Sequence, residues 1–233
     1  MRYSFFLYIA ILFVGCEDVV TIPLPDEQNL VVVEGWITDR EEIQQIRLTR
    51  SNSFLGTFNP IIEDAAVIVE ERNGAFFSYL YQGNGYYLSA STFSGVRNQE
   101  YRVEIRLSNG DIIQSEWSRM PPRTDIISLE IDDFIENDPD SPGQELIVFF
   151  PRVTALDSAD FSNYYRWMFS KNSAQLTAPE SITLQNDRFF DGNLIPNQFD
   201  SFEYELTDTV AVALLSINKS AFEFLDLLKS QIT

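Results

Sequence analysis

The chain has 233 residues, of which 35 are acidic, 16 are basic and none is histidine, so its formal net charge is −19. This acidity argues against nucleic-acid binding, which needs a basic surface. The lack of histidine excludes Ser-His-Asp and Cys-His catalysis and histidine ligation of metals, so we expect a non-enzymatic protein without a cofactor. Aromatic residues make up 14% of the chain, which excludes a disordered protein.

The N-terminal residues resemble a lipoprotein signal peptide. Residues 3–14 form an apolar run of 12 residues after Met1-Arg2, shorter than the about 20 residues that span a bilayer. The run ends in LFVGC (12–16), which resembles a lipobox, although Phe13 stands where an aliphatic residue is usual. We predict a signal peptide over 1–15 and lipid attachment at Cys16, the sole cysteine. An ordinary signal peptide, or a membrane anchor with an incidental cysteine, is the alternative.

Residues 16–28 are predicted to form an extended acidic tether, because two prolines and four acids interrupt any regular pattern. Glu17 and Asp18 directly follow the cysteine. In lipoproteins of the Bacteroidota type, acids at this place resemble a surface-export signal. The alternative is that these acids simply solvate the tether, which leaves open the face of the membrane on which the protein lies.

Residues 29–119 are predicted to form an antiparallel β-sandwich. Short segments rich in β-branched and aromatic residues alternate at period two and are separated by turn residues such as Asn73-Gly74. The predicted strands cover residues 30–38, 43–49, 65–71, 75–81, 86–88, 101–107 and 112–117.

A second β-rich module is predicted over residues 125–233, after a Pro-Pro linker at 120–124 that a central strand cannot contain. Ser220 and Glu223 fit a capping box for a helix over 220–232, the only helix expected in this module. The predicted strands of the module cover residues 126–131, 145–150, 164–170, 181–185, 202–206 and 209–217.

An acidic segment at 132–143 is predicted to be a loop between two of these strands. Its oxygen-bearing side chains are the ligands that calcium prefers, although their spacing is not that of an EF-hand. A solvated hairpin loop is the alternative to a metal site. The candidate ligands are Asp132, Asp133, Asp138 and Asp140.

Tyr164, Tyr165 and Trp167 lie within four residues of one another and are candidates for contact with a sugar or peptide ligand. Alternating aromatics on a strand also fit a packed core, so both interpretations remain open. With 35 acids, a catalytic carboxylate pair of the glycosidase kind also stays formally possible, although no motif marks one.

Several segments, taken with the lipobox, resemble the Bacteroidota lipoprotein family called domain of unknown function 4249 (DUF4249). They are LVVVEGWITD (30–39), IRLTRS (46–51), DAAVIVEERNG (64–74), GNGYYLS (83–89), YRVEIRLSNGDIIQSE (101–116), MPP (120–122), YYRW (164–167) and VAVALLSINKSAFEFLDLL (210–228). The resemblance implies an N-terminal Ig-like or transthyretin-like sandwich followed by a second β-rich region. It also implies an association with TonB-dependent outer-membrane receptors. Members of the family continue beyond the segment equivalent to 220–232, which implies that this chain is truncated at its C-terminus.

The functional expectation is therefore a binding or accessory lipoprotein of the outer membrane, attached through Cys16, with a TonB-dependent receptor as its partner. A surface hydrolase that uses two carboxylates and a structural or adhesion module of the envelope are the alternatives. The sequence does not identify a ligand.

Overall fold

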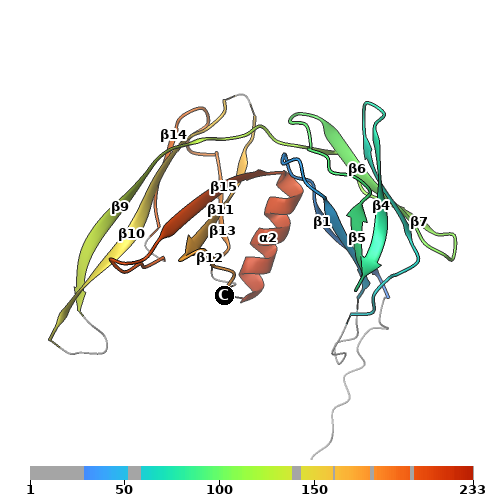
Figure 1. Cartoon of the computed structure of the whole chain (residues 1–233). Helices are drawn as coiled ribbons and strands as arrows, with labels where there is room; N and C mark the ends of the chain where they lie inside the picture. Colours follow the sequence, from blue (N-terminus) through green and yellow to red (C-terminus); the bar gives the residue numbers. More distant parts are fainter. Residues whose placement is uncertain are drawn as a thin grey trace, which may run out of the picture.

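The computed structural model describes residues 29–51, 59–137, 143–159, 161–178, 181–199 and 202–232 (Figure 1). The predicted signal peptide, Cys16 and the whole predicted tether lie outside these residues. Antiparallel strands dominate the described chain, and helix α2 (Lys219–Ile232) follows the last of them. The predicted mainly-β fold with a C-terminal helix is thus confirmed. Within the described ranges, no helix combines the length and apolar character needed to cross a membrane.

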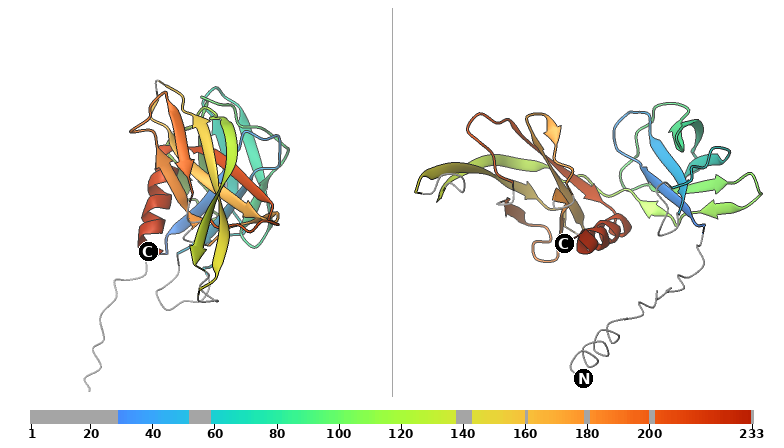
Figure 2. Two further views of the ribbon diagram at one scale, coloured as in Figure 1. Left: turned by 90° about the vertical axis from the view of Figure 1, so that its left-hand side faces the viewer. Right: turned by 90° about the horizontal axis from the view of Figure 1, so that it is seen from below.

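The N-terminal strands form one eight-stranded antiparallel sheet that curls around its own core (Figure 2). Its order is β1-β2-β5-β4-β3-β6-β7, and β8 also pairs with β6. The strands are β1 (Val31–Trp36), β2 (Gln45–Arg50), β3 (Ala66–Glu71), β4 (Phe76–Gly83), β5 (Tyr86–Ser89), β6 (Glu100–Arg106), β7 (Ile112–Gln114) and β8 (Ser118–Arg119).

The core of this sheet follows from the alternation in the sequence, because every second side chain of a strand points to the same face. Leu48 and Ile105 are fully buried in it, and Val67 and Val69 of β3 are almost so. The predicted turn at Asn73-Gly74 is also confirmed: Gly74 has a φ of 102°, and its N–H donates to the Glu71 carbonyl.

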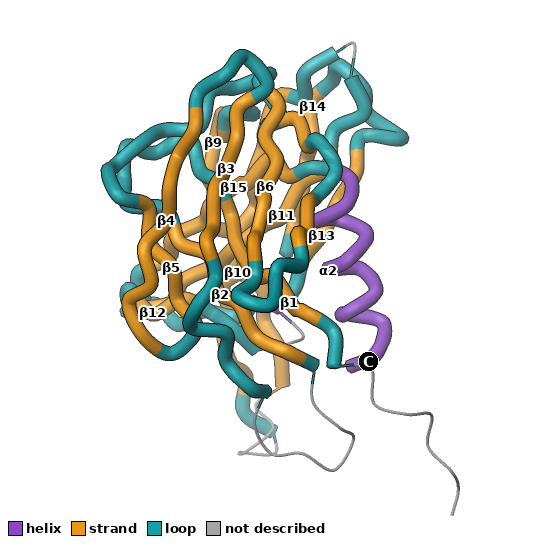
Figure 3. The backbone as a smooth tube through the Cα atoms, turned by 90° about the vertical axis from the view of Figure 1, so that its right-hand side faces the viewer, coloured by secondary structure: helices purple, strands orange, loops and turns teal. Residues whose placement is uncertain are grey.

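The C-terminal strands form two smaller antiparallel sheets (Figures 1 and 3). The first has the order β14-β10-β9, and in the second β11 lies between β15 on one side and β12 and β13 on the other. The strands are β9 (Ile126–Asn137), β10 (Glu145–Leu156), β11 (Tyr164–Lys171), β12 (Ala174–Gln175), β13 (Thr183–Asn186), β14 (Leu194–Gln198) and β15 (Val210–Ile217). Their shared core includes Val153, Trp167, Phe169 and Ile195.

Two predictions for this region were wrong. The segment 132–137 is not a loop, because β9 continues to Asn137 and pairs with β10 over its whole length. The segment 202–206 is not a strand, since only Tyr204 forms an isolated bridge, to Phe149. The nearby strand β14, which contains Pro196, was not predicted. Proline is tolerated there because β14 lies at the edge of its sheet.

Helix α2 begins one residue earlier than predicted and has a different cap. The Ala221 N–H donates to Asn218 Oδ1 at 2.7 Å, so Asn218 and not Ser220 is the N-cap. The helix packs through Leu225, which is buried, and through Phe222, whose ring lies 5.1 Å from that of Tyr164. It lies on the side of its module that is nearer the N-terminal sheet (Figures 1 and 2).

Two polar or aromatic contacts join the N-terminal sheet to the C-terminal strands. Asn218 Nδ2 donates to Ser118 Oγ at 2.7 Å. The guanidinium of Arg119 lies 5.9 Å from the ring centroid of Phe161. Both contacts involve residues of β8, the short strand that directly precedes the Pro-Pro segment.

Asp208 ties the beginning of β15 to the end of β11. Its carboxylate pairs with Lys171 Nζ at 2.8 Å and accepts hydrogen bonds from Asn172 Nδ2 at 2.6 Å and the Glu205 N–H at 2.8 Å. These contacts, the Lys171 hydrogen bond first, lower the pKa of Asp208 to about 2. The carboxylate of Asp208 therefore binds a proton more weakly in the folded protein than in the unfolded chain.

Because the pKa of Asp208 falls on folding, its contribution to stability is present above about pH 4 and is lost as the pH falls toward 2. We expect Asp208→Asn to lower the free energy of unfolding at pH 6 and to differ less from the wild type at pH 2.5. Urea unfolding measured from pH 6 to pH 2.5 checks this, with Asp226→Asn, an exposed change on α2, as the control. A difference that stays constant with pH would contradict the assignment.

Candidate functional site: an aspartate cluster at the ends of three strands

The structure separates the acids that the sequence proposed as calcium ligands. Asp132 and Asp133 are successive residues of β9, so their side chains point to opposite faces of the strand. Asp132 pairs with Arg152 at 3.0 Å. Asp138 and Asp140 lie outside the described residues. Among the described candidates, therefore, no pair of carboxylates converges on one point.

The proposed ligand-binding aromatics lie in packed positions. Tyr165 and Trp167 are 0% and 1% exposed, and they belong to the core of the C-terminal strands. Trp167 Nε1 donates to Gln185 Oε1 at 3.0 Å, which satisfies the buried indole. Tyr164 points to the other face of β11 and packs on Phe222 of α2. In this structure all three act as packing residues, which is the second of the two interpretations left open by the sequence.

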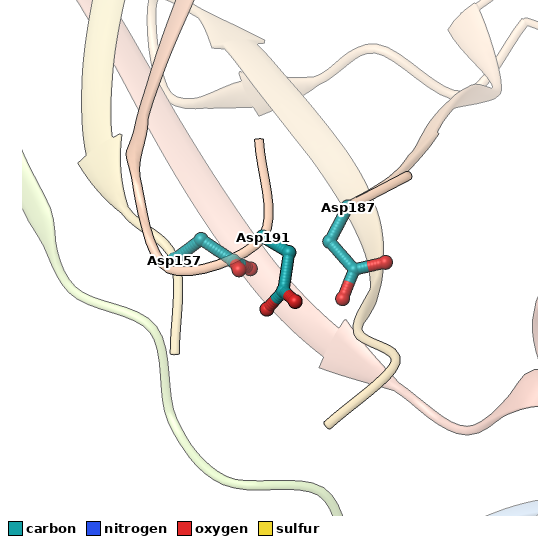
Figure 4. A group of neighbouring side chains, drawn as sticks. All are labelled: Asp157, Asp187 and Asp191. Carbon is teal, nitrogen blue, oxygen red and sulfur yellow. The ribbon is translucent and has the colours of Figure 1, made fainter. Parts of the chain in front are cut away.

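A group that the sequence did not reveal is formed by Asp157, Asp187 and Asp191. One carboxylate oxygen from each lies within 4.8 Å of the others, and the three side chains converge in Figure 4. Asp157 follows β10, Asp187 follows β13, and Asp191 lies in the turn before β14. The first two are buried and Asp191 is exposed.

Asp157 is held by donors on both of its oxygens. The Tyr165 hydroxyl donates to Oδ1, and the Gly192 N–H donates to Oδ2 at 2.8 Å. The same hydroxyl accepts a hydrogen bond from Thr124 Oγ1 at 3.1 Å. Burial first, and then the hydrogen bond to Asp157, raise the pKa of Tyr165 well above its ordinary value. The phenol therefore remains protonated, and it remains a donor to the carboxylate, at any physiological pH.

The turn that carries Asp191 is shaped by Gly192. This residue has a φ of +69°, and a Cβ added there would lie 2.9 Å from the Cβ of Ala159. Glycine meets both demands, since it tolerates positive φ and has no side chain. The close approach brings the Gly192 N–H to Asp157 and so places Asp191 beside it.

Asp187 is the second buried carboxylate, and it accepts the Asn163 N–H on Oδ2 at 2.6 Å. Asp187 and Asp191 also line an open pocket with Phe161, Ser162 and Arg188. Because both oxygens of Asp157 are already occupied, Asp187 and Asp191 are the members with capacity left to hold a hard cation or a substrate hydroxyl.

Sequence reasoning missed this cluster for a physical reason. Asp157 lies 30 residues before Asp187, and only the pairing of β10 with β14 and of β11 with β13 brings the strand ends together. The one local signal is the short polar turn DRFFDG (187–192), in which two acids flank a pair of aromatics.

We expect Asp157→Ala to destabilise the fold by about 1–3 kcal/mol, because it leaves the buried Tyr165 hydroxyl and the Gly192 N–H without their acceptor. Denaturant unfolding measures the change. Asp191→Asn, at the exposed member of the same cluster, is the matched control and is expected within about 0.5 kcal/mol of the wild type. Equal effects of the two variants would show that the hydrogen bonds of Asp157 do not hold this region together.

The comparisons with known proteins give one family. A search of curated proteins finds no match. The family model described as Domain of unknown function (DUF4249) matches residues 17–233, nearly the whole chain and both sets of strands. The segments between residues 30 and 228 that suggested this family lie inside the matched range, the lipobox at 12–16 precedes it, and the chain belongs to the DUF4249 family.

Proposed function

We propose that this protein is a lipid-anchored, non-enzymatic binding or accessory component of the outer membrane that acts beside a TonB-dependent receptor. The observation that carries the proposal is the exposed apolar side of the hairpin made by β9 and β10. Ile127, Ile131 and Ile135 of β9 are 58%, 45% and 65% exposed. Apolar residues gathered on an exposed surface in this way mark contact with another molecule.

The position of the hairpin supports the same proposal. It extends from the C-terminal strands away from the N-terminal sheet (Figures 1 and 2). The proposed tether after Cys16 would lead directly into the N-terminal sheet. The hairpin belongs to the C-terminal strands, which follow later in the chain. This separation suits a protein in which one part is anchored and another makes the contact.

A second candidate function, a hydrolase that uses two carboxylates, has one observation in its favour. Asp187 and Asp191 line the same pocket, and their oxygens lie within 4.8 Å of each other. Retaining glycosidases place their two carboxyl groups about 5–5.5 Å apart. Against this function, one oxygen of Asp187 accepts a hydrogen bond from the Asn163 N–H, which is a structural role. Hydrolysis of envelope glycans that is lost in Asp191→Asn would favour the hydrolase.

The anchor is tested by Cys16→Ser. We expect the variant to leave the membrane fraction and to lack the mass of attached acyl chains, because a stable anchor requires two or more chains on this residue. Cell fractionation and intact-protein mass spectrometry measure both. Asp18→Asn, two residues away, is the control and is expected to stay lipidated. Retention of Cys16→Ser in carbonate-washed membranes would refute lipid anchoring.

The partner is tested by cross-linking in native membranes followed by affinity purification. We expect a TonB-dependent barrel to be recovered with the wild-type protein, and less of it with Ile131→Lys, which places a charge in the exposed apolar surface. Leu80→Lys, an equally exposed position on β4, is the matched control and should recover the barrel normally. Repeated recovery of lipidated protein without any barrel would count against the proposal.

A further inference from the structure

Among the residues that the structure describes, none pairs with the outer edge of strand β9. It is the last strand of its sheet, and in the part of the chain that the structure describes it pairs only with β10. Its 12 residues span about 40 Å. Proteins usually protect such an edge with proline, charged side chains (lysine above all), a bulge or a covering element. The charges of β9 are all acidic. β9 contains neither proline nor lysine, and the single irregularity of the pair lies at its beginning, beside Thr154 and Ala155.

The two faces of β9 have different chemistry. Alternate residues of a strand share a face, and the odd-numbered face carries exposed aliphatic side chains with one acid among them. The even-numbered face carries three acids at exposed or half-buried positions, with the exposed Phe134 between the last two of them. The aliphatic residues are Ile127, Leu129, Ile131 and Ile135, and the acids of the even face are Glu130, Asp132 and Glu136.

The neighbouring strand already shows which side chain suits the acidic face. Arg152 of β10 lies opposite Glu130. Its guanidinium pairs with Glu130 at 2.7 Å and with Asp132 at 3.0 Å. On the apolar face, β10 places Val153 opposite Leu129 and Ile147 opposite Ile135. β10 therefore presents apolar residues to both faces of β9, with Phe150 opposite Asp132 and Leu146 opposite Glu136, and its one base, Arg152, lies on the face that carries the acids.

We propose that the free edge of β9 accepts an extended segment of a partner protein in which apolar and basic residues alternate. The backbone of that segment would continue the sheet by strand addition. Its apolar side chains would cover the isoleucines of the odd face, and its lysines or arginines would lie beside the acids of the even face. This inference rests on the proposed function and extends it, because it names the kind of segment that the protein binds.

Charge argues for a partner protein rather than a second copy or a lipid surface. The chain carries a formal charge of −19, and a second β9 at the same edge would place acids against acids. Anionic lipid would meet the same repulsion. An alternating basic segment removes this repulsion and uses the backbone groups of the edge at the same time.

The test measures binding of synthetic ten-residue peptides to the purified full-length chain. The first peptide alternates valine and lysine, the second alternates valine and glutamate, and the third has the first peptide's composition in two blocks. We expect only the first to bind and to slow amide hydrogen exchange in 126–137. Binding of the glutamate or block peptide with equal affinity would overturn the proposal, as would protection elsewhere in the chain.

Variants separate the edge from general effects of charge. We expect Glu130→Gln/Glu136→Gln to weaken binding of the alternating lysine peptide roughly tenfold, as expected for two exposed ion pairs. Glu63→Gln/Glu116→Gln changes the net charge equally at exposed sites elsewhere and should not weaken binding. Equal weakening by both pairs would overturn the proposal. Circular dichroism and thermal unfolding confirm that each variant is folded.

Two further results would replace the partner with another occupant. Dimers in sedimentation that Ile135→Lys abolishes would assign the edge to a second copy of the chain. Binding to phosphatidylcholine–phosphatidylglycerol vesicles that Ile135→Lys abolishes, without peptide binding, would assign the surface to lipid. Peptide binding does not depend on Cys16, so failure here is distinct from failure of the membrane anchor.

Discussion

The C-terminal strands depend on one buried hydrogen-bonded group, the hydroxyl of Tyr165 between Thr124 and Asp157. Three segments meet at this oxygen and its carboxylate partner: the end of the Pro-Pro region, the end of β10 and the beginning of β11. Gly192 adds a fourth through the other oxygen of Asp157. A buried carboxylate is costly unless its oxygens accept hydrogen bonds, so these segments are constrained to meet here. The aspartate cluster is a consequence of this arrangement. The hydrogen bond from Gly192 to Asp157 places the preceding residue, Asp191, beside Asp157.

Much of the fold was predictable because antiparallel strands with one buried face leave a period-two signal. That signal identified β3 and β6 to within one residue, and β3 shows it most clearly, since Val67 and Val69 are buried and the residues between and beside them are more accessible. It failed for the distal half of β9, because Asp132, Asp133 and Glu136 interrupt its apolar residues, and an acidic stretch resembles a loop when its partner strand is unknown. It failed for β14 because the sequence LIPNQ does not alternate between apolar and polar residues. The cap of α2 was misplaced since Asn218 and Ser220 both satisfy the preference for that position.

The candidate site was not predictable from one sequence. Asp157, Asp187 and Asp191 are ordinary strand-end and turn residues, and only long-range pairing brings them together. Tyr165 and Trp167 raised the opposite difficulty. Their alternation was visible, but alternation alone does not distinguish a core from a binding surface. The structure distinguishes them by burial, because neither ring has accessible area.

The hairpin of β9 and β10 has the fewest neighbouring elements where its apolar residues are most exposed. β14 supports β10 only over 152–156, and beyond that the pair has the Phe149–Tyr204 bridge and the contact of Phe134 with Phe150, whose ring centroids are 5.5 Å apart. Two-stranded ribbons are marginally stable in water without a third strand or a covering element. Local stability is therefore expected to be lowest in the distal half of the hairpin. A strand added at β9 would supply the missing third strand there, so the segment that gains most from a partner is also the one that presents the alternating apolar and acidic faces.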